Sequence, residues 1–215
     1  MKEIKYTLLS DGSSDKRLIP ILDWLLNEHC PELTVQSEWA DFSRLPQKPK
    51  TLEDKIQKSI ELYPCNILFI HRDAEGISHE QRIQEIIQAV KTVSKRIPEP
   101  PSICVVPVRM QEAWILFDEP AIRKAAGNPN GKIKLTLPDF NTIETLSDPK
   151  GYLMDLLISA SGLKGRHLEK LKRDIHKKAY LVAENIENFA LLKNLPAFMS
   201  LENDLKEFIN NKKWG

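Results

Sequence analysis

The chain has 215 residues, of which 41% are hydrophobic and 28% charged, and its formal net charge is +1 at pH 7. These values are typical of an ordinary globular protein with one domain or one and a half, and they exclude a strong overall field for nucleic acid or membranes. No apolar run reaches transmembrane length, and the start of the chain does not resemble a secretory signal. The three cysteines lie far apart without a C-x-x-C pair, as free thiols do in a reducing compartment. We therefore expect a cytoplasmic protein with no membrane partner.

The first 110 residues alternate between strand-like and helix-like segments. Two continuous apolar runs, at 65–70 and 102–108, predict strands that are buried on both faces, as central parallel strands are. The pattern therefore predicts an α/β fold with a mainly parallel sheet. In chain order we predict a strand at 4–10, a helix at 14–28, a strand at 33–40, a helix at 51–63, a strand at 65–70, a helix at 78–96 and a strand at 102–108.

The second half of the chain is expected to be helical. The stretches "QEAWILFD" and "EPAIRKAAG" have helical patterns, and Gly127 ends the second of them. Residues 127–149 are rich in Pro, Gly, Asn and Asp, which indicates a connection made mostly of loops. Further helices are predicted at 152–161, 164–185 and 200–212, with a shorter piece before the last. We predict an α/β core over 1–126 and, packed on it, a loop-rich and helical part over 127–215.

The order of the strands decides which polar residues meet. Residues 33–40 alternate between apolar and polar, which indicates an edge strand, so the first and third strands become neighbours in the order 2-1-3-4. In such sheets ligands bind outside the carboxyl ends of the strands, where the winding direction changes. We therefore expect Asp11 and Asp73 to be neighbours, with Arg109 and Glu112 at the same edge of the sheet.

Carboxylates gathered in this way repel one another unless a cation lies between them. Mg²⁺ is the cation that carboxylate oxygens suit best, and Mn²⁺ is the alternative. The candidate metal ligands are Asp11, Asp73, Glu75 and Glu112. The chemistry that such a site serves is displacement at phosphorus, with Asp11, Asp15 and Asp73 as the candidate catalytic residues. The alternatives are a plain Asp-Gly turn at Asp11 and a helix start at Asp15.

Three motifs resemble those of a known family. They are Asp11-Gly12-Ser13-Ser14-Asp15, Asp73-Ala74-Glu75-Gly76 and Glu112-Ala113-Trp114. In their order they resemble the TOPRIM domain of topoisomerases, primases and OLD-type nucleases, and more narrowly the small stand-alone TOPRIM-like proteins of bacteria. The resemblance implies a TOPRIM-like (Rossmann-like) fold and a Mg²⁺-dependent nuclease that acts on DNA or RNA. It also implies a role in bacterial or phage defence beside an ATPase partner. Asp11 stands where the family has Glu, and Glu75 stands where it has Asp.

Basic residues supply candidate contacts to a substrate. Arg72 and Arg109 flank the acidic turns and are suited to clamping a phosphate, although ordinary solvated or ion-paired arginines fit the sequence equally well. Residues 164–178 form a basic helical stretch that includes Lys170 and Arg173. Such a helix suits a nucleic-acid backbone, and a solvated helix face is its alternative. No G-x-x-x-x-G-K-[ST] segment is present, so ATPase activity would need a partner chain.

Non-catalytic functions also fit the acidic turns. The pattern Asp11-x-Ser13 is similar to a metal-ion-dependent adhesion site, although that motif has Ser where this chain has Asp15. A response-regulator receiver also carries acids after its first and third strands, but it needs a fifth strand that ends in Lys. A degenerate TOPRIM scaffold that binds a partner without catalysis is the remaining alternative to the nuclease.

Overall fold

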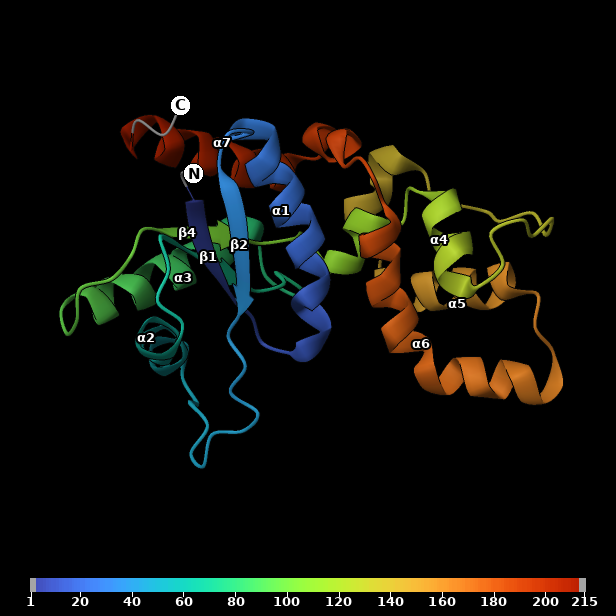
Figure 1. The fold of residues 1–215 in the computed structure, drawn as a ribbon, viewed down its shortest axis with the longest axis horizontal. Helices are drawn as coiled ribbons and strands as arrows, with labels where there is room; N and C mark the ends of the chain where they lie inside the picture. The colour runs from blue at the N-terminus through green and yellow to red at the C-terminus, as the bar shows by residue number, and fades with distance from the viewer. Residues whose placement is uncertain (1–2, 213–215) are drawn as a thin grey trace.

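A computed structural model of the chain, which describes residues 3–212, contains a four-stranded sheet in the order β2-β1-β3-β4 (Figure 1). All three strand pairs are parallel. The α/β class, the parallel sheet and the order 2-1-3-4 predicted from the sequence are therefore confirmed. The strands are β1 (Glu3–Leu9), β2 (Thr34–Trp39), β3 (Ile67–His71) and β4 (Ser102–Val105).

The exposure of each strand follows its place in the sheet. All five residues of β3 are buried, whereas β2 has no buried residue, as expected of a central strand and an edge strand. In β1, Tyr6 lies opposite Ser37 of β2 and Ile67 of β3. Its ring packs edge-on against Phe69, with the ring centroids 5.2 Å apart, so aromatic packing adds to the hydrogen bonds between the two inner strands.

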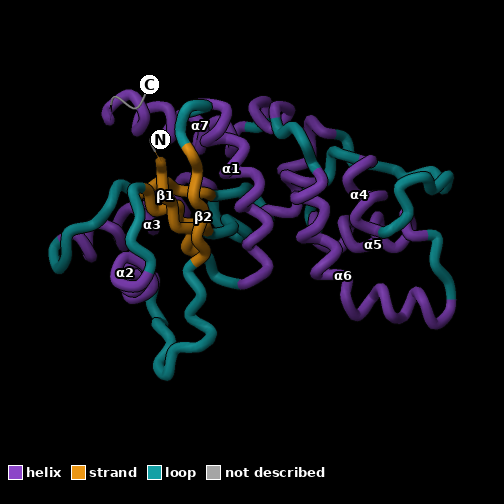
Figure 2. Tube along the Cα trace, viewed as in Figure 1, coloured by secondary structure: helices purple, strands orange, loops and turns teal. Residues whose placement is uncertain are grey.

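Helices cover both faces of the sheet. Side chains of a strand point alternately to its two faces, and Leu8 and Leu9 accordingly belong to different hydrophobic clusters. The cluster around Leu8 includes side chains of α1 (Leu18–His29) and α7 (Pro196–Lys212). The cluster around Leu9 includes side chains of α2 (Leu52–Leu62) and α3 (His79–Ser94). Figure 2 shows β1 and β2 between α1 on one side and α2 with α3 on the other.

The remaining helices extend the α1 side of the molecule. Helix α4 (Glu119–Ala126) packs against α5 (Pro149–Ser161) and α6 (Gly165–Asn185). Helix α6 also packs against α1 and against the 3-10 turn η1 (Ser13–Arg17) that follows β1 (Figure 1). Three further 3-10 turns are η2 (Gln111–Ile115), η3 (Phe140–Thr145) and η4 (Ala190–Asn194). One hydrophobic cluster runs from β1 through these helices, which holds α6 and η1 side by side.

Local chemistry sets the ends of the helices. Four helices begin at a residue whose side chain accepts a hydrogen bond from the first turn, which satisfies an otherwise unpaired N–H. These caps are Thr51 for α2, Ser78 for α3, Asp118 for α4 and Asp148 for α5. Gly127 and Gly162 end α4 and α5 with positive φ, which glycine adopts without strain. Among residues 3–212, no helix has the length and apolar character needed to cross a bilayer.

Some predicted boundaries were wrong by a few residues. The predicted helix at 14–28 opens as the 3-10 turn η1 and becomes α-helical only at Leu18. The strand predicted at 102–108 ends at Val105, shortly before Pro107, whose missing N–H does not fit a central strand. Helices α5 and α7 begin at Pro149 and Pro196, earlier than predicted, because proline is well suited to the first helical position.

The first prediction concerns the centre of the sheet. Phe69 is completely buried between β1 and the helices around α1, so the substitution Phe69→Ala should lower the free energy of unfolding by about 3–5 kcal/mol. Urea denaturation followed by circular dichroism measures this loss. The control is Leu62→Ala at the exposed end of α2, where we expect a change within about 0.5 kcal/mol. Equal losses in the two variants would contradict the assignment of Phe69 to the core.

Candidate acidic site

Three segments meet at the carboxyl ends of the strands. The turn after β1 contains Asp11 and Asp15, the turn after β3 contains Asp73, and η2 follows β4 and contains Glu112. β1 and β3 are neighbours in the sheet although β2 lies between them in the sequence. The segments therefore lie at a point where the winding of the sheet changes direction, which is where open α/β sheets bind ligands.

Asp15 is buried at the start of η1, with 7% of its surface exposed. Its Oδ2 accepts a hydrogen bond from the backbone N–H of Gly12 at 2.9 Å, and its Oδ1 accepts one from the Ser14 hydroxyl at 3.0 Å. The side-chain amide of Gln111 also donates to Oδ1. Asp15 is thus both a capping residue of the 3-10 turn and a buried carboxylate that faces the segment after β4.

Asp73 lies directly beyond the buried strand β3. Its Oδ1 accepts a hydrogen bond from the backbone N–H of Gln111 at 3.0 Å and lies 3.6 Å from Nε2 of His71. Burial raises the pKa of Asp73 to about 6, and repulsion by the carboxylates of Glu112 and Asp15 acts in the same direction. The imidazole of His71 and the N–H of Gln111 oppose this shift. The raised pKa shows that Asp73, Asp15 and Glu112 are close enough to repel one another.

Glu112 is neutralised by a buried ion pair. Its Oε1 accepts a hydrogen bond from Nη1 of Arg17 at 2.8 Å, and both side chains are at most 5% exposed. Arg17 is held in place by a second hydrogen bond, from its Nε to the carbonyl oxygen of Ser14 at 2.8 Å. The pair therefore joins η1 to η2, two segments that are far apart in the sequence.

Three residues of this site were not singled out from the sequence. Gln111 bonds Asp73 through its backbone and Asp15 through its side chain, while its buried Oε1 has no hydrogen-bond partner among the described residues. Gln111 directly precedes the motif at Glu112, and this is the signal that pointed toward it. Arg17 and His71 gave no such signal, because a buried pairing depends on tertiary structure that one sequence does not reveal.

Asp11 makes different contacts from the other acids. Its carboxylate is hydrogen-bonded by Nζ of Lys55 at 2.6 Å and by Nε of Arg72 at 3.2 Å. Burial alone would raise the pKa of Asp11, but the hydrogen bonds and charges of Lys55 and Arg72 lower it below the ordinary value. Arg72 also pairs with Glu85 of α3, so two carboxylates already engage the guanidinium that was predicted to clamp a phosphate. Asp11 thus belongs to an ion-pair network on the α2 side of the sheet.

Glu75 and Arg109 lie at the exposed rim of the site. Glu75 has a φ of 50°, in the left-handed region that residues other than glycine seldom adopt. Its backbone carbonyl accepts a hydrogen bond from Nη1 of Arg109 at 3.4 Å, and no contact of its carboxylate is found within residues 3–212. Both side chains are therefore open to solvent beside Asp73.

The predicted nucleic-acid contacts Lys170 and Arg173 are exposed on α6. They share one stripe of the helix with Lys177, because residues three and four apart lie on the same face. Lys177 lines a cavity together with Gly12 and Ser14 of the turn after β1. The structure thus brings the basic helix beside the first acidic turn, and it leaves both predicted side chains accessible.

The donor atoms at the site suit a hard cation, although no ion site is preformed. Within the described part of the chain, no three His, Cys, Asp or Glu side chains are grouped so that they could hold a metal ion. Asp15 and Glu112 are held instead by N–H donors and by Arg17. The carboxylates and the unpartnered Oε1 of Gln111 are all oxygen donors, the type that Mg²⁺ takes.

Comparison with known proteins identifies no relative: no family model, no curated protein and no solved structure matches this chain. The resemblance to TOPRIM-like proteins therefore stays a prediction from the motifs, and the functional argument depends on the geometry of the site.

The second prediction concerns the pH dependence of stability. The folded pKa of Asp73, about 6, lies above its ordinary value of 3.8, so the folded state binds the proton more tightly than the unfolded state. Ionisation of Asp73 therefore destabilises the fold as the pH rises, by less than about 1 kcal/mol near pH 4 and by up to about 3 kcal/mol above pH 7. Asp73→Asn should remove this cost. We expect the variant to gain stability over the wild type in urea titrations as the pH rises, and a constant difference would contradict the buried acidic cluster.

The third prediction concerns the ion pair between Arg17 and Glu112. Arg17→Met removes the only charge paired with Glu112 among the described residues, so it should cost about 3–5 kcal/mol of unfolding free energy. The double variant Arg17→Met/Glu112→Leu should recover most of this loss, because no unpaired charge remains buried. Denaturant titration of the two single variants and the double variant measures the coupling, and additive losses would show that the pair does not act as a unit.

Proposed function

We propose that the protein is a Mg²⁺-dependent phosphodiester hydrolase that acts on nucleic acid. The observation that carries the proposal is the convergence of Asp73, Asp15 and Glu112 at the switch point of the sheet, close enough for repulsion to raise the pKa of Asp73. Nothing in the fold itself requires three carboxylates there. Such an arrangement is expensive for stability and is typical of a functional site.

The residues that would hold the cation are Asp73, Asp15 and Glu112, with the free Oε1 of Gln111 as a fourth oxygen donor. Glu75, exposed beside Asp73, is a further candidate ligand. Mg²⁺, when bound, supplies a positive charge that polarises a phosphoryl oxygen and lowers the pKa of a water molecule. For this the Asp15 side chain has to exchange the N–H donors of Gly12 and Gln111 for the cation.

The chain supplies the other functions of a hydrolase from the same region. Asp73, with a pKa of about 6, can hold or release a proton close to neutral pH. Arg109 is exposed at the rim, where it can approach a phosphate without first breaking an ion pair. Lys170 and Arg173 supply positive charge on the neighbouring helix α6. We place Asp11 outside the reacting group, because Lys55 and Arg72 already neutralise it.

The biological setting follows only from the resemblance to small bacterial TOPRIM-like proteins. On that basis we propose a cytoplasmic enzyme that works beside an ATPase partner in phage defence. The motifs at residues 11–15, 73–76 and 112–114 support this setting through their order, and their common position at one edge of the sheet is consistent with it.

A non-catalytic, metal- or partner-binding module is the second candidate. One observation favours it: Arg17 neutralises Glu112 inside the protein, and no metal site is preformed among residues 3–212. A scaffold that kept the acidic turns for packing would have this appearance. The two candidates differ in whether the carboxylate of Asp73 is needed for a reaction.

The fourth prediction tests catalysis. Wild-type protein, incubated with Mg²⁺ or Mn²⁺ and with single-stranded DNA, double-stranded DNA or RNA, should cleave at least one polymer. Asp73→Asn should lower the cleavage rate about 100-fold or more, because it removes a charged metal ligand while keeping the shape of the side chain. Gel electrophoresis of end-labelled substrates measures the rate.

Asp11→Asn is the matched control, since it removes the same charge from the neighbouring ion-pair network. We expect it to retain most of the activity. An equal loss in both variants would return Asp11 to the reacting group, as the sequence suggested. No cleavage of any polymer by folded wild-type protein in either metal would favour the binding module.

A further inference from the structure

A second cavity lies beside the acidic site, on the α6 side of the first turn. Its volume is about 730 Å³, within the range of pockets that bind small molecules. Its walls come from the turn after β1, from Lys150 at the start of α5 and from residues 176–181 of α6. These elements are held together by the packing of α6 against η1 and α5. The cavity is therefore built by the fold and does not depend on one loop.

The charges around this cavity are of one sign. Lys16, Lys150 and Lys177 line it, and no Asp or Glu is among the described residues of its wall. Nζ of Lys16 lies 4.2 Å from the centroid of the Trp39 ring, and this cation–π contact holds its position. Lys177 has one partner, Asp174, in an exposed pair of 3.2 Å that solvent screens strongly. An anion entering the cavity would therefore meet three ammonium groups.

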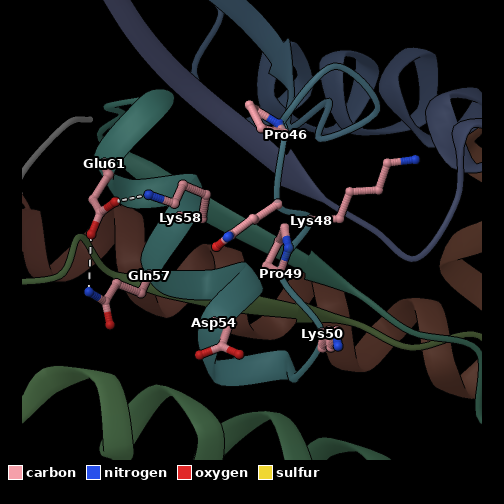
Figure 3. A pocket seen from close by; sticks show the side chains of 9 residues that line it. Pro46, Lys48, Pro49, Lys50, Asp54, Gln57, Lys58 and Glu61 are labelled. Carbon is pink, nitrogen blue, oxygen red and sulfur yellow. Dashed lines mark hydrogen bonds and ion pairs between the residues drawn. The ribbon is translucent and has the colours of Figure 1, made fainter.

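Another cavity of the molecule gives a useful comparison. Figure 3 shows the space of about 860 Å³ between α2 and the loop before it, which is also lined by three lysines. Asp54 and Glu61 lie in the same wall, and Nζ of Lys58 bonds Glu61 at 2.6 Å. The positive charge there is largely compensated. Lysine alone is thus common on this surface, and the cavity beside α6 differs from its neighbour in the lack of acidic groups.

The remaining lining suits the other parts of a nucleotide. The hydroxyl of Ser13 is exposed at the turn and can donate a hydrogen bond to a phosphate oxygen. The half-buried ring of Tyr180 and the side chain of Leu181 add an apolar surface on α6. An aromatic face of this kind stacks on a nucleobase of any sequence.

The cavity and the acidic site share one turn of the chain. The N–H of Gly12 and the hydroxyl of Ser14 bond the carboxylate of Asp15, and both residues also line the cavity. A phosphate bound against this turn would lie beside the acidic cluster, separated from it by the turn itself. The geometry thus couples an anion pocket to the site proposed to hydrolyse phosphodiesters.

We propose that this cavity binds a nucleotide unit through its phosphate, with the three lysines around the phosphate and Tyr180 against the base. Its role in positioning a substrate rests on the proposed hydrolase function, whereas the binding itself does not. The unit is either a free nucleotide or one residue of a nucleic-acid strand, since both present the same phosphate and base.

The fifth prediction tests this binding without catalysis. Calorimetry in EDTA measures the affinity of the full chain for a nucleoside 5′-monophosphate and for the matching nucleoside, and fluorescence anisotropy does so for a labelled single-stranded oligonucleotide. Lys150→Gln/Lys177→Gln should weaken phosphate-dependent binding about tenfold or more, because two charge-assisted contacts are lost. For the oligonucleotide, the slope of log K against log salt should also fall by about two.

The control double variant is Lys48→Gln/Lys58→Gln, which removes the same charge from the cavity of Figure 3 and should change the affinity by less than about twofold. Binding of the monophosphate but not the nucleoside assigns the cavity to a free nucleotide. Binding of the oligonucleotide alone assigns it to a unit of a strand. Equal losses in the two double variants, or no binding of any probe, would overturn the proposal. Binding that survives without any Mg²⁺-dependent cleavage would instead count against the hydrolase and leave the cavity assigned.

Discussion

The arrangement of the acidic site depends on Gln111, which holds two carboxylates that would otherwise repel each other. Its backbone N–H bonds Asp73 and its side-chain amide bonds Asp15, so one residue after β4 fixes the turns after β1 and β3. Because each donated hydrogen bond offsets part of the cost of burying a charge, the acids can approach without a cation between them. The free Oε1 of the same residue is the oxygen that this bridge leaves without a donor.

Charge compensation divides the five acids of this edge into three groups. Glu112 is paired with Arg17 inside the protein, Asp11 is paired with Lys55 and Arg72 on the α2 side, and Glu75 is exposed to solvent. Only Asp73 and Asp15 combine burial with a lack of any cationic side chain of Arg or Lys as partner among the described residues. The chemistry of the site is therefore concentrated on these two carboxylates.

The sheet could be predicted because its signals are local and periodic. The continuous apolar runs identified β3 and β4, and the alternating pattern of β2 identified an edge, so that right-handed connections left one natural strand order. The meeting of Asp73 and Glu112 at one edge follows from that order alone. Side-chain partners could not be predicted in the same way. Whether Asp11 turns toward Asp73 or toward Lys55 depends on the packing of α2, and the bond from Arg17 to Glu112 spans 95 residues of sequence.

The two backbone donors of the site, at Gly12 and Gln111, have a consequence for how the protein can be observed. Both amides sit at turns after strands, where amide hydrogens ordinarily exchange with solvent quickly, yet each is bonded to a carboxylate of the acidic cluster. Their exchange rates and chemical shifts therefore report on the cluster directly. Any cation that draws Asp15 or Asp73 away from these amides releases them, so nuclear magnetic resonance of two backbone positions can follow occupancy of the site in a protein that performs no reaction.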